Sequence, residues 1–225
     1  MTTTSPVSCD SAEDGERLRH NLARVHERIN ASGRDPRDVR VVAVTKTFSA
    51  QDVRVAAMVG LTTFGENYVD ELCRKRREVD NPATQWHYLG VLQTNKIARV
   101  LGCADVVCSL SRTREVERVA ALAPGASVYC QVDVTGGATR NGVAPAHFGD
   151  LVLRARDAGL DVRGVMVVAP VEPSAARAAF QLTRALADQW RLDECSMGMS
   201  NDLELACQSG TTELRIGRAL FGPRV

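Results

Sequence analysis

The chain has 225 residues, with 28 basic and 27 acidic side chains and a formal net charge of +1. This length suits one α/β barrel or two small domains, and the charge balance excludes a general attraction to nucleic acid or to an anionic membrane surface. Because no apolar run is long enough to span a bilayer and residues 1–7 lack the pattern of a secretion signal, the sequence predicts a cytoplasmic protein.

Seven cysteines are spread along the chain without a Cys-x-x-Cys pair. Several of them lie within apolar stretches, which predicts reduced thiols that act as small hydrophobic side chains. Cys103 and Cys108 flank an expected helix-to-strand turn and are interpreted as structural. There are four histidines and none is paired with another at ligand spacing, so no metal site is predicted.

The chain begins with a polar segment, residues 1–10, that is predicted to be disordered. From Ser11, acidic residues precede apolar residues at helical spacing, and Gly33 ends this predicted N-terminal helix. The run Val39–Lys46 is rich in β-branched residues and almost continuously apolar. Such a run is typical of a strand that is buried on both faces in a parallel sheet.

Strand and helix patterns then alternate to the end of the chain. The further expected strands cover residues 61–65, 85–89, 104–109, 126–134, 160–168, 194–196 and 213–216, and each is followed by a helical stretch. In the helix expected over 66–79, the basic run 74–77 is accompanied by acidic residues and is interpreted as a solvated, salt-bridged face. Regular alternation predicts parallel strands, and eight units predict a single (β/α)8 TIM barrel over residues 11–225 with an extra N-terminal helix.

Lys46 ends the first expected strand and therefore lies at the C-terminal mouth of the barrel. Functional groups of this fold collect at that mouth, and a partly desolvated lysine there loses some of its preference for the charged form. A neutral amine can attack an aldehyde. The alternative is a lysine that ends the strand and points into solvent.

Two loops at the same mouth carry small residues that suit an anion. The segments Ser196–Asp202 and Arg215–Gly222 follow the seventh and eighth strands, where barrels often bind phosphate. Arg215 would be a permanently charged donor for the ring nitrogen of a pyridine cofactor, or else a structural partner of a carboxylate. A lysine, a phosphate cradle and this arginine are together the parts of a pyridoxal phosphate site.

Six motifs occur in an order that resembles the YggS-type pyridoxal phosphate homeostasis proteins. They are the segments 42–47, 64–69, 86–96, 164–170, 196–202 and 215–222, within residues 11–225. The resemblance implies a barrel like the N-terminal domain of alanine racemase, with Lys46 holding pyridoxal 5'-phosphate as an internal aldimine. The lysine at the end of the first expected strand is thus the residue that the resemblance implies as the cofactor lysine.

The resemblance also implies roles for further residues. Ser196 with the backbone of Met197, and Gly217 with the backbone of Arg218, would hold the phosphate, while Arg215 would face the pyridine nitrogen. Asn67 and His87 would line the pocket near the ring, although His87 could instead pack against Trp86 or Tyr88. Arg218 stands where the resembling family has a small hydroxyl residue.

These roles favour a carrier over an enzyme. Arginine cannot stabilise a proton on the ring nitrogen, so the ring stays a poor electron sink. The chain also stops after the eighth unit, where alanine racemase continues into a domain that supplies a second base. The expected function is pyridoxal phosphate homeostasis, by buffering or by delivery to apo-enzymes, in a monomer. The alternatives are a weak amino-acid racemase that uses pyridoxal phosphate and an aldolase-type barrel without the cofactor.

Overall fold

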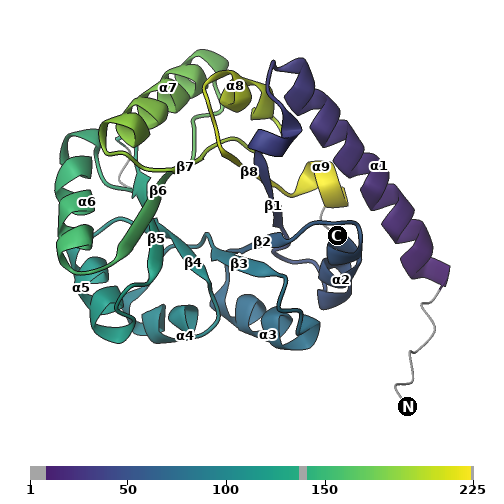
Figure 1. Ribbon diagram of the computed structural model, residues 1–225, viewed down its shortest axis with the longest axis horizontal. Coiled ribbons are helices and arrows are strands. Elements are labelled where there is room, and N and C mark those ends of the chain that lie inside the picture. Colours follow the sequence, from purple (N-terminus) through teal and green to yellow (C-terminus); the bar gives the residue numbers. More distant parts are fainter. Residues whose placement is uncertain (1–8, 137–140, 224–225) are drawn as a thin grey trace.

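The computed structural model describes residues 9–136 and 141–223. Within them, parallel strands form a closed barrel (Figure 1). The strands are β1 (Arg40–Val44), β2 (Thr63–Glu66), β3 (Gln85–Tyr88), β4 (Val106–Leu110), β5 (Ser127–Val132), β6 (Asp161–Val167), β7 (Glu194–Ser196) and β8 (Glu213–Ile216). β1 pairs with both β2 and β8, which closes the sheet. The predicted (β/α)8 barrel is thereby confirmed, and the strand ends differ from the expected ones by a residue or two at most.

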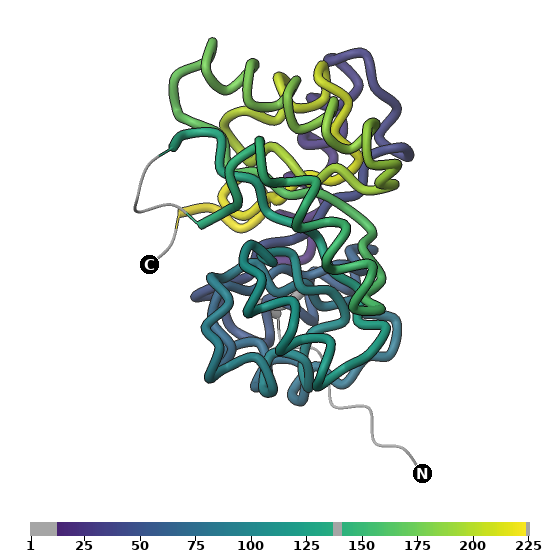
Figure 2. Tube along the Cα trace, turned by 90° about the vertical axis from the view of Figure 1, so that its left-hand side faces the viewer, coloured from purple at the N-terminus to yellow at the C-terminus, as the bar shows by residue number. Residues whose placement is uncertain are grey.

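Helices cover the outside of this barrel (Figure 1). The α-helices are α1 (Cys9–Ala31), α2 (Ala50–Met58), α3 (Val69–Val79), α4 (Ile97–Leu101), α5 (Thr113–Leu122), α6 (Phe148–Asp157), α7 (Pro173–Gln189), α8 (Leu203–Gln208) and α9 (Arg218–Phe221). Short 3-10 helices lie at η1 (Pro36–Asp38), η2 (Thr94–Lys96) and η3 (Pro145–His147). The teal-green segment after β5 and the yellow segment after β8 reach the same side of the molecule, as the ends of parallel strands must (Figure 2).

The strands bury side chains on both faces, as the near-continuous apolar runs predict. Outward-facing residues pack against the helices in the main hydrophobic core. A smaller apolar cluster fills the interior of the barrel, formed by Val106, Cys108, Tyr129 and Met166 with Leu89 against it. Because the interior is filled, a ligand can bind only at one end of the barrel.

The long N-terminal helix joins the two ends of the chain. α1 begins at Cys9, so residues 9 and 10 of the predicted disordered segment are helical, and residues 1–8 lie outside the described part. It packs against α2, α8 and α9 (Figure 1). Asn21 donates to the carbonyl of Leu220 at 2.8 Å. Among the helices of the described residues, none combines the length and apolar character needed to cross a membrane.

The cysteines differ from the prediction of thiols only. Cys73 on α3 and Cys103 after α4 form a disulfide, with Cα atoms 5.2 Å apart. Both residues lie on the outside of the barrel, where the turn after α4 passes α3, and that approach could not be deduced from their separation in sequence. Cys108 is buried inside the barrel as a free thiol, in line with its structural interpretation.

The basic run on α3 is not a uniformly solvated face. Arg74 and Arg77 are exposed, but Lys75 is fully buried. Its ammonium nitrogen lies 2.7 Å from Glu66 Oε1 and 2.9 Å from Glu71 Oε2. The prediction was wrong for Lys75 because this residue falls three positions after the buried Leu72, on the inward stripe of the helix.

Candidate functional site

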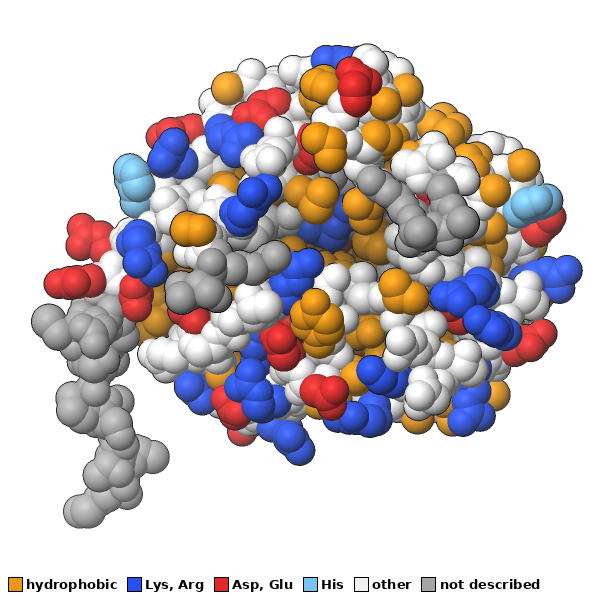
Figure 3. All heavy atoms as spheres, turned by 180° about the vertical axis from the view of Figure 1, so that it is seen from behind, with side chains coloured by type: hydrophobic (Ala, Val, Ile, Leu, Met, Phe, Trp, Pro, Cys, Tyr) orange, Lys and Arg blue, Asp and Glu red, His pale blue; other side chains and the backbone are white. Residues whose placement is uncertain are grey.

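The C-terminal mouth of the barrel is hollowed at its centre. Figure 3 looks onto this face and shows basic atoms at the floor of the hollow with hydrophobic side chains around it. Lys46, Asn67, Ser196 and Gly217 all lie at or just after the C-terminal ends of strands. The parallel topology therefore gathers most of the predicted site residues at this mouth.

Lys46 lies two residues after the end of β1 and is partly buried. It occupies a tight turn in which the amide of Phe48 donates to the carbonyl of Thr45 at 3.0 Å. Thr47 has a positive φ of 71°, which is uncommon for a residue with a β-branched side chain. Ser49 then caps α2 with a capping box that includes Asp52, which fixes where the helix begins. The lysine thus lies on a short, well-defined connection between β1 and α2.

Arg215 points into the barrel just below the mouth and is held by neighbouring strands. Its Nη1 donates to the carbonyl and to the hydroxyl oxygen of Ser196 at 2.7 and 2.8 Å. Its Nη2 donates to the carbonyl of Val167 at 2.6 Å. Burial lowers the pKa of the guanidinium, while the charge of Glu213 opposes that change. These bonds fix the orientation of the planar head.

Ser196 has a role that the sequence did not indicate. It is the last residue of β7, it is fully buried, and its side chain faces the barrel interior, where its hydroxyl accepts a hydrogen bond from Arg215. The amide of Met197 donates to the carbonyl of Glu213 at 3.1 Å, within the sheet. The phosphate contacts expected of Ser196 and Met197 remain predictions, and the observed contacts orient Arg215 and join β7 to β8.

The loops after β7 and β8 lie against each other. The amide of Arg215 donates to the carbonyl of Gly198 at 3.0 Å, and the amide of Ala219 donates to Ser200 Oγ at 3.1 Å. Gly198 has a φ of +93°, and a Cβ there would collide with Ala206. Gly217 precedes α9 beside β1, where an added Cβ would lie 3.3 Å from the carbonyl oxygen of Val44. The two glycine-containing segments thus meet at the mouth, as the sequence predicts.

Asn67 and Arg218 complete the rim. Asn67 directly follows the last residue of β2 and is partly buried, and its carbonyl lies so close to Gly90 that a Cβ on Gly90 would collide with it. Arg218 is exposed at the start of α9 and, with Arg24 and Arg28 of α1, lines a surface cavity of about 260 Å³. Its side chain therefore lies on the α1 side of α9.

His87 lies deeper than the other predicted residues. It is fully buried on β3 and faces the barrel interior, where its ring meets Tyr129 edge-on with centroids 5.9 Å apart. Its Nδ1 is 3.6 Å from Glu213 Oε2. Packing of His87 against Trp86 or Tyr88 is not what the structure shows, because neighbours on a strand point to opposite faces. Glu213 precedes Arg215 by two residues, so His87 contacts the layer below Arg215.

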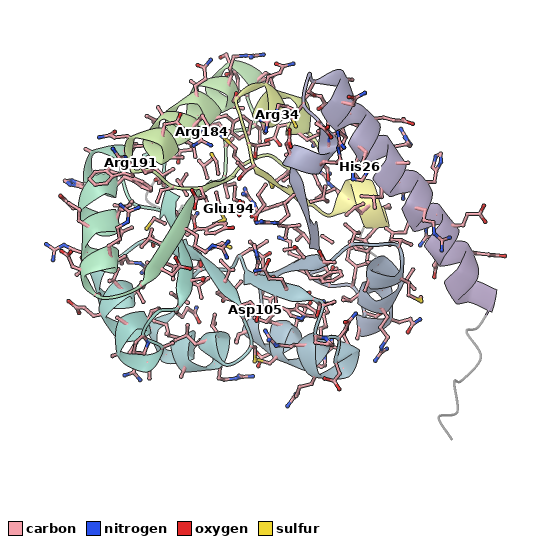
Figure 4. All side chains as sticks on the ribbon, viewed as in Figure 1. His26, Arg34, Asp105, Arg184, Arg191 and Glu194 are labelled. Atoms are coloured by element: carbon pink, nitrogen blue, oxygen red, sulfur yellow. A yellow bond between two sulfur atoms is a disulfide. The ribbon has the colours of Figure 1, made fainter. Side chains whose placement is uncertain are left out.

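This interior layer is a buried polar cluster. Tyr129 donates to Glu213 Oε2 at 3.2 Å, and Arg40 reaches both Glu213 and Glu194. Glu194 extends from β7 toward the centre of the barrel (Figure 4). Burial alone would raise the pKa of Glu213, but its interactions with His87, Ser196 and Arg40 lower it to about 2. The cluster forms a charged floor beneath Arg215.

Sequence reasoning missed several residues of this region. The hydroxyl of Ser200, in the loop after β7, and the carboxylate of Glu213, below Arg215, were not singled out. For Glu213 a signal existed, because it shares the inward face of β8 with Arg215 in a period of two. For Ser200 there was none, since its position depends on how one loop packs on the next.

Comparisons with known proteins agree with this architecture. The family model for the N-terminal domain of alanine racemase matches residues 14–225. The chain is 38% identical to a pyridoxal phosphate homeostasis protein of Pseudomonas aeruginosa, over 93% of this chain and 95% of that protein. It is 32% identical to the homeostasis protein of the same name from Escherichia coli, over 92% and 97%. The crystal structure of PipY from Synechococcus elongatus with pyridoxal phosphate bound is similar, with a TM-score of 0.81, 30% identity, and coverage of 91% of this chain and 100% of PipY.

Proposed function

Because the chain belongs to the family of the alanine racemase N-terminal domain, we propose that it binds pyridoxal 5'-phosphate at the barrel mouth and acts in homeostasis of that cofactor. The relatives that bear the name pyridoxal phosphate homeostasis protein support this function. The observation that carries the proposal is the gathering of Lys46, Arg215 and the loops after β7 and β8 at one mouth.

The donor set suits the chemistry of this cofactor. When bound, pyridoxal phosphate would supply a reactive aldehyde, and the amine of Lys46 would hold that aldehyde covalently. Arg215, held by Ser196 and Val167, would direct a donor at the ring nitrogen. Around the phosphate, Gly217, the backbone of Arg218 and the hydroxyl of Ser200 would provide donors.

We place the remaining predicted residues around this arrangement in supporting roles. Ser196 would act mainly by orienting Arg215, and the Met197 amide by joining β7 to β8. Asn67 would line the side of the ring from the end of β2. His87 lies below Arg215 and would affect the site through the charge of Glu213, rather than by direct contact with the cofactor ring.

The site supports a carrier more than a racemase. Racemisation needs a second base that can reach the far face of the substrate, in addition to the lysine. The Tyr129 hydroxyl does not suit that role, because it donates to Glu213 inside the barrel and burial raises its pKa. Arg215 at the ring nitrogen further limits stabilisation of a carbanion. The proposed function is therefore to hold the cofactor reversibly as a monomer and to release it to apo-enzymes.

The visible spectrum of the purified chain with added pyridoxal phosphate tests the binding. We expect an absorption band that is absent from Lys46→Ala, and borohydride reduction should fix the cofactor to Lys46. A wild-type chain without the band would overturn the cofactor assignment and favour an aldolase-type barrel.

Two further assays test the carrier role. With L-alanine, a chiral product assay should detect no D-alanine, whereas steady D-alanine formation would make the chain a racemase. The loaded chain should also reactivate an apo-aminotransferase in the presence of a phosphatase that destroys free pyridoxal phosphate. Failure of that transfer, with binding intact, would limit the function to buffering.

A further inference from the structure

The buried Lys75 makes an unusual set of contacts for a residue of an outer helix. Its ammonium group donates to the carbonyl of Thr45 at 2.6 Å, to Glu66 Oε1 at 2.7 Å and to Glu71 Oε2 at 2.9 Å. An ammonium has three protons to donate, so these acceptors satisfy it completely. All three acceptors belong to the segments that surround the start of the β1–α2 turn.

The same atoms reach the residues on both sides of Lys46. On one side, the carbonyl of Thr45 accepts from Lys75, and the hydroxyl of Thr45 donates to Glu66 Oε1 at 2.7 Å. On the other side, the amide of Thr47 donates to Glu71 Oε2 at 2.8 Å, the oxygen that also accepts from Lys75. The backbone is therefore fixed immediately before and immediately after Lys46.

The bond to Thr47 compensates an unfavourable backbone conformation. Thr47 has a φ of 71°, in a region that β-branched residues avoid. Without an acceptor for its amide, the turn would relax toward commoner dihedrals and would rotate the adjacent Lys46. Glu71 thus keeps the turn in the shape that directs Lys46.

Stability alone does not explain this arrangement. Replacing a buried ion pair by apolar side chains of similar volume is often neutral or stabilising, and position 75 lies on the apolar stripe of α3. A fully buried lysine at such a position points to a requirement for defined geometry.

We propose that Lys75 is a positioning residue for Lys46, acting through Thr45 and, by way of Glu71, through Thr47. The ammonium of Lys75 holds both flanks of the turn, so that the amine of Lys46 is directed at the aldehyde of a cofactor bound at the mouth. This inference rests on the proposed function, since it concerns how the same site presents its lysine.

Glu71→Ala is the sharpest test. The Glu71 side chain is 24% exposed, so this change releases Thr47 without leaving a buried carboxylate unpaired, and Lys75 keeps Glu66 and the Thr45 carbonyl. We expect at least tenfold weaker binding of pyridoxal phosphate, and a tenfold slower rise of the absorption band in stopped-flow mixing. Glu71→Gln should restore most of both, because an amide oxygen can accept the same two bonds.

Asp70→Ala is the matched control. Asp70 is the neighbouring acid on α3, is well exposed and pairs with Arg99 instead. Binding of pyridoxal phosphate by this variant should equal that of the wild type. Lys75→Met is the stronger variant and should lose the band if the chain still folds, as measured by circular dichroism.

The outcomes separate this inference from the proposed function. No band in the wild type rejects the proposed function itself. A wild-type band that Glu71→Ala leaves unchanged in affinity and rate overturns the positioning role, as does an equal loss in Asp70→Ala. A loss in Glu71→Ala that Glu71→Gln does not restore also overturns it, because the hydrogen bond to Thr47 would then not be the cause.

Discussion

At the scale of single residues, Arg215 combines charge with a fixed orientation. Its guanidinium donates to two carbonyls and one hydroxyl inside the barrel. These acceptors lie in different directions, and the fixed planar array of N–H groups in a guanidinium reaches them better than the single nitrogen of an ammonium would. The side chain is both a structural bridge between β6, β7 and β8 and the proposed partner of a ring nitrogen. One conservative change tests both roles.

We predict that Arg215→Lys destabilises the fold and weakens cofactor binding together. A lysine cannot reach both Ser196 and Val167, and a buried carbonyl left without a donor costs about 1 to 3 kcal/mol. Urea unfolding should show a loss in that range, and titration should show weaker binding of pyridoxal phosphate by about tenfold or more. Unchanged affinity in a destabilised variant would assign Arg215 a structural role alone.

Glu213 predicts a dependence of stability on pH. Its pKa in the folded chain is about 2, against an ordinary value of 4.5. A carboxylate with a lowered pKa in the folded state contributes stability above pH 4.5, and this is lost as pH falls toward 2. The shift corresponds to about 3 kcal/mol. Glu213→Gln should therefore flatten the fall in unfolding free energy between pH 5 and 2.

Urea titrations at several pH values would measure that change. Glu117→Gln, at an exposed acid on α5, is the control and should follow the wild-type curve. A Glu213→Gln curve as steep as that of the wild type would show that other carboxylates carry the acid sensitivity.

At the scale of elements, the sequence predicted the strands well, but it did not show which polar side chains of the helices are buried. Runs of β-branched residues marked β1 and β6, and alternation with helices allowed little besides a barrel. Lys46 was singled out because it ends the expected strand, which is a local feature of the sequence. Lys75 was missed because its burial depends on the approach of α3 to the β1–α2 turn, a contact between segments thirty residues apart.

The disulfide between α3 and the turn after α4 adds a second constraint on α3. It closes a loop with a sequence separation of 30 residues. In the chain-entropy model such a loop is worth about 3 to 4 kcal/mol. The variant with Cys73→Ser and Cys103→Ser should lose stability in that range relative to the oxidised wild type.

Thermal unfolding with and without a reducing agent would check this prediction. Reduction should lower the midpoint of the wild type toward that of the double variant, and should leave the double variant unchanged. Equal midpoints for oxidised and reduced wild type would mean that the cross-link adds no stability.

At the scale of the whole molecule, α1 connects the start of the chain to the loop that is proposed to hold the phosphate. α1 packs on α8 and α9, the elements that follow β7 and β8 (Figure 1). Arg28 makes a bidentate ion pair with Glu204 on α8, and Asn21 donates a hydrogen bond to the carbonyl of Leu220 on α9. α1, which precedes the barrel, thus supports the two helices that follow the loops proposed to bind the phosphate.

We predict that Asn21→Ala loosens α9 and weakens cofactor binding from a distance. The lost hydrogen bond should cost about 1 to 3 kcal/mol of unfolding free energy, because Leu220 is fully buried and its carbonyl loses its side-chain donor. Since Ser200 is bonded to Ala219 in the same short helix, displacement of α9 would also shift the donors proposed for the phosphate. Calorimetric titration with pyridoxal phosphate should show an affinity reduced by about threefold to fivefold, with the Lys46 band still present at saturation.

Arg19→Ala, at an exposed position of α1, is the control and should bind like the wild type. An Asn21→Ala variant with wild-type affinity would show that α1 stabilises the barrel without reaching its mouth.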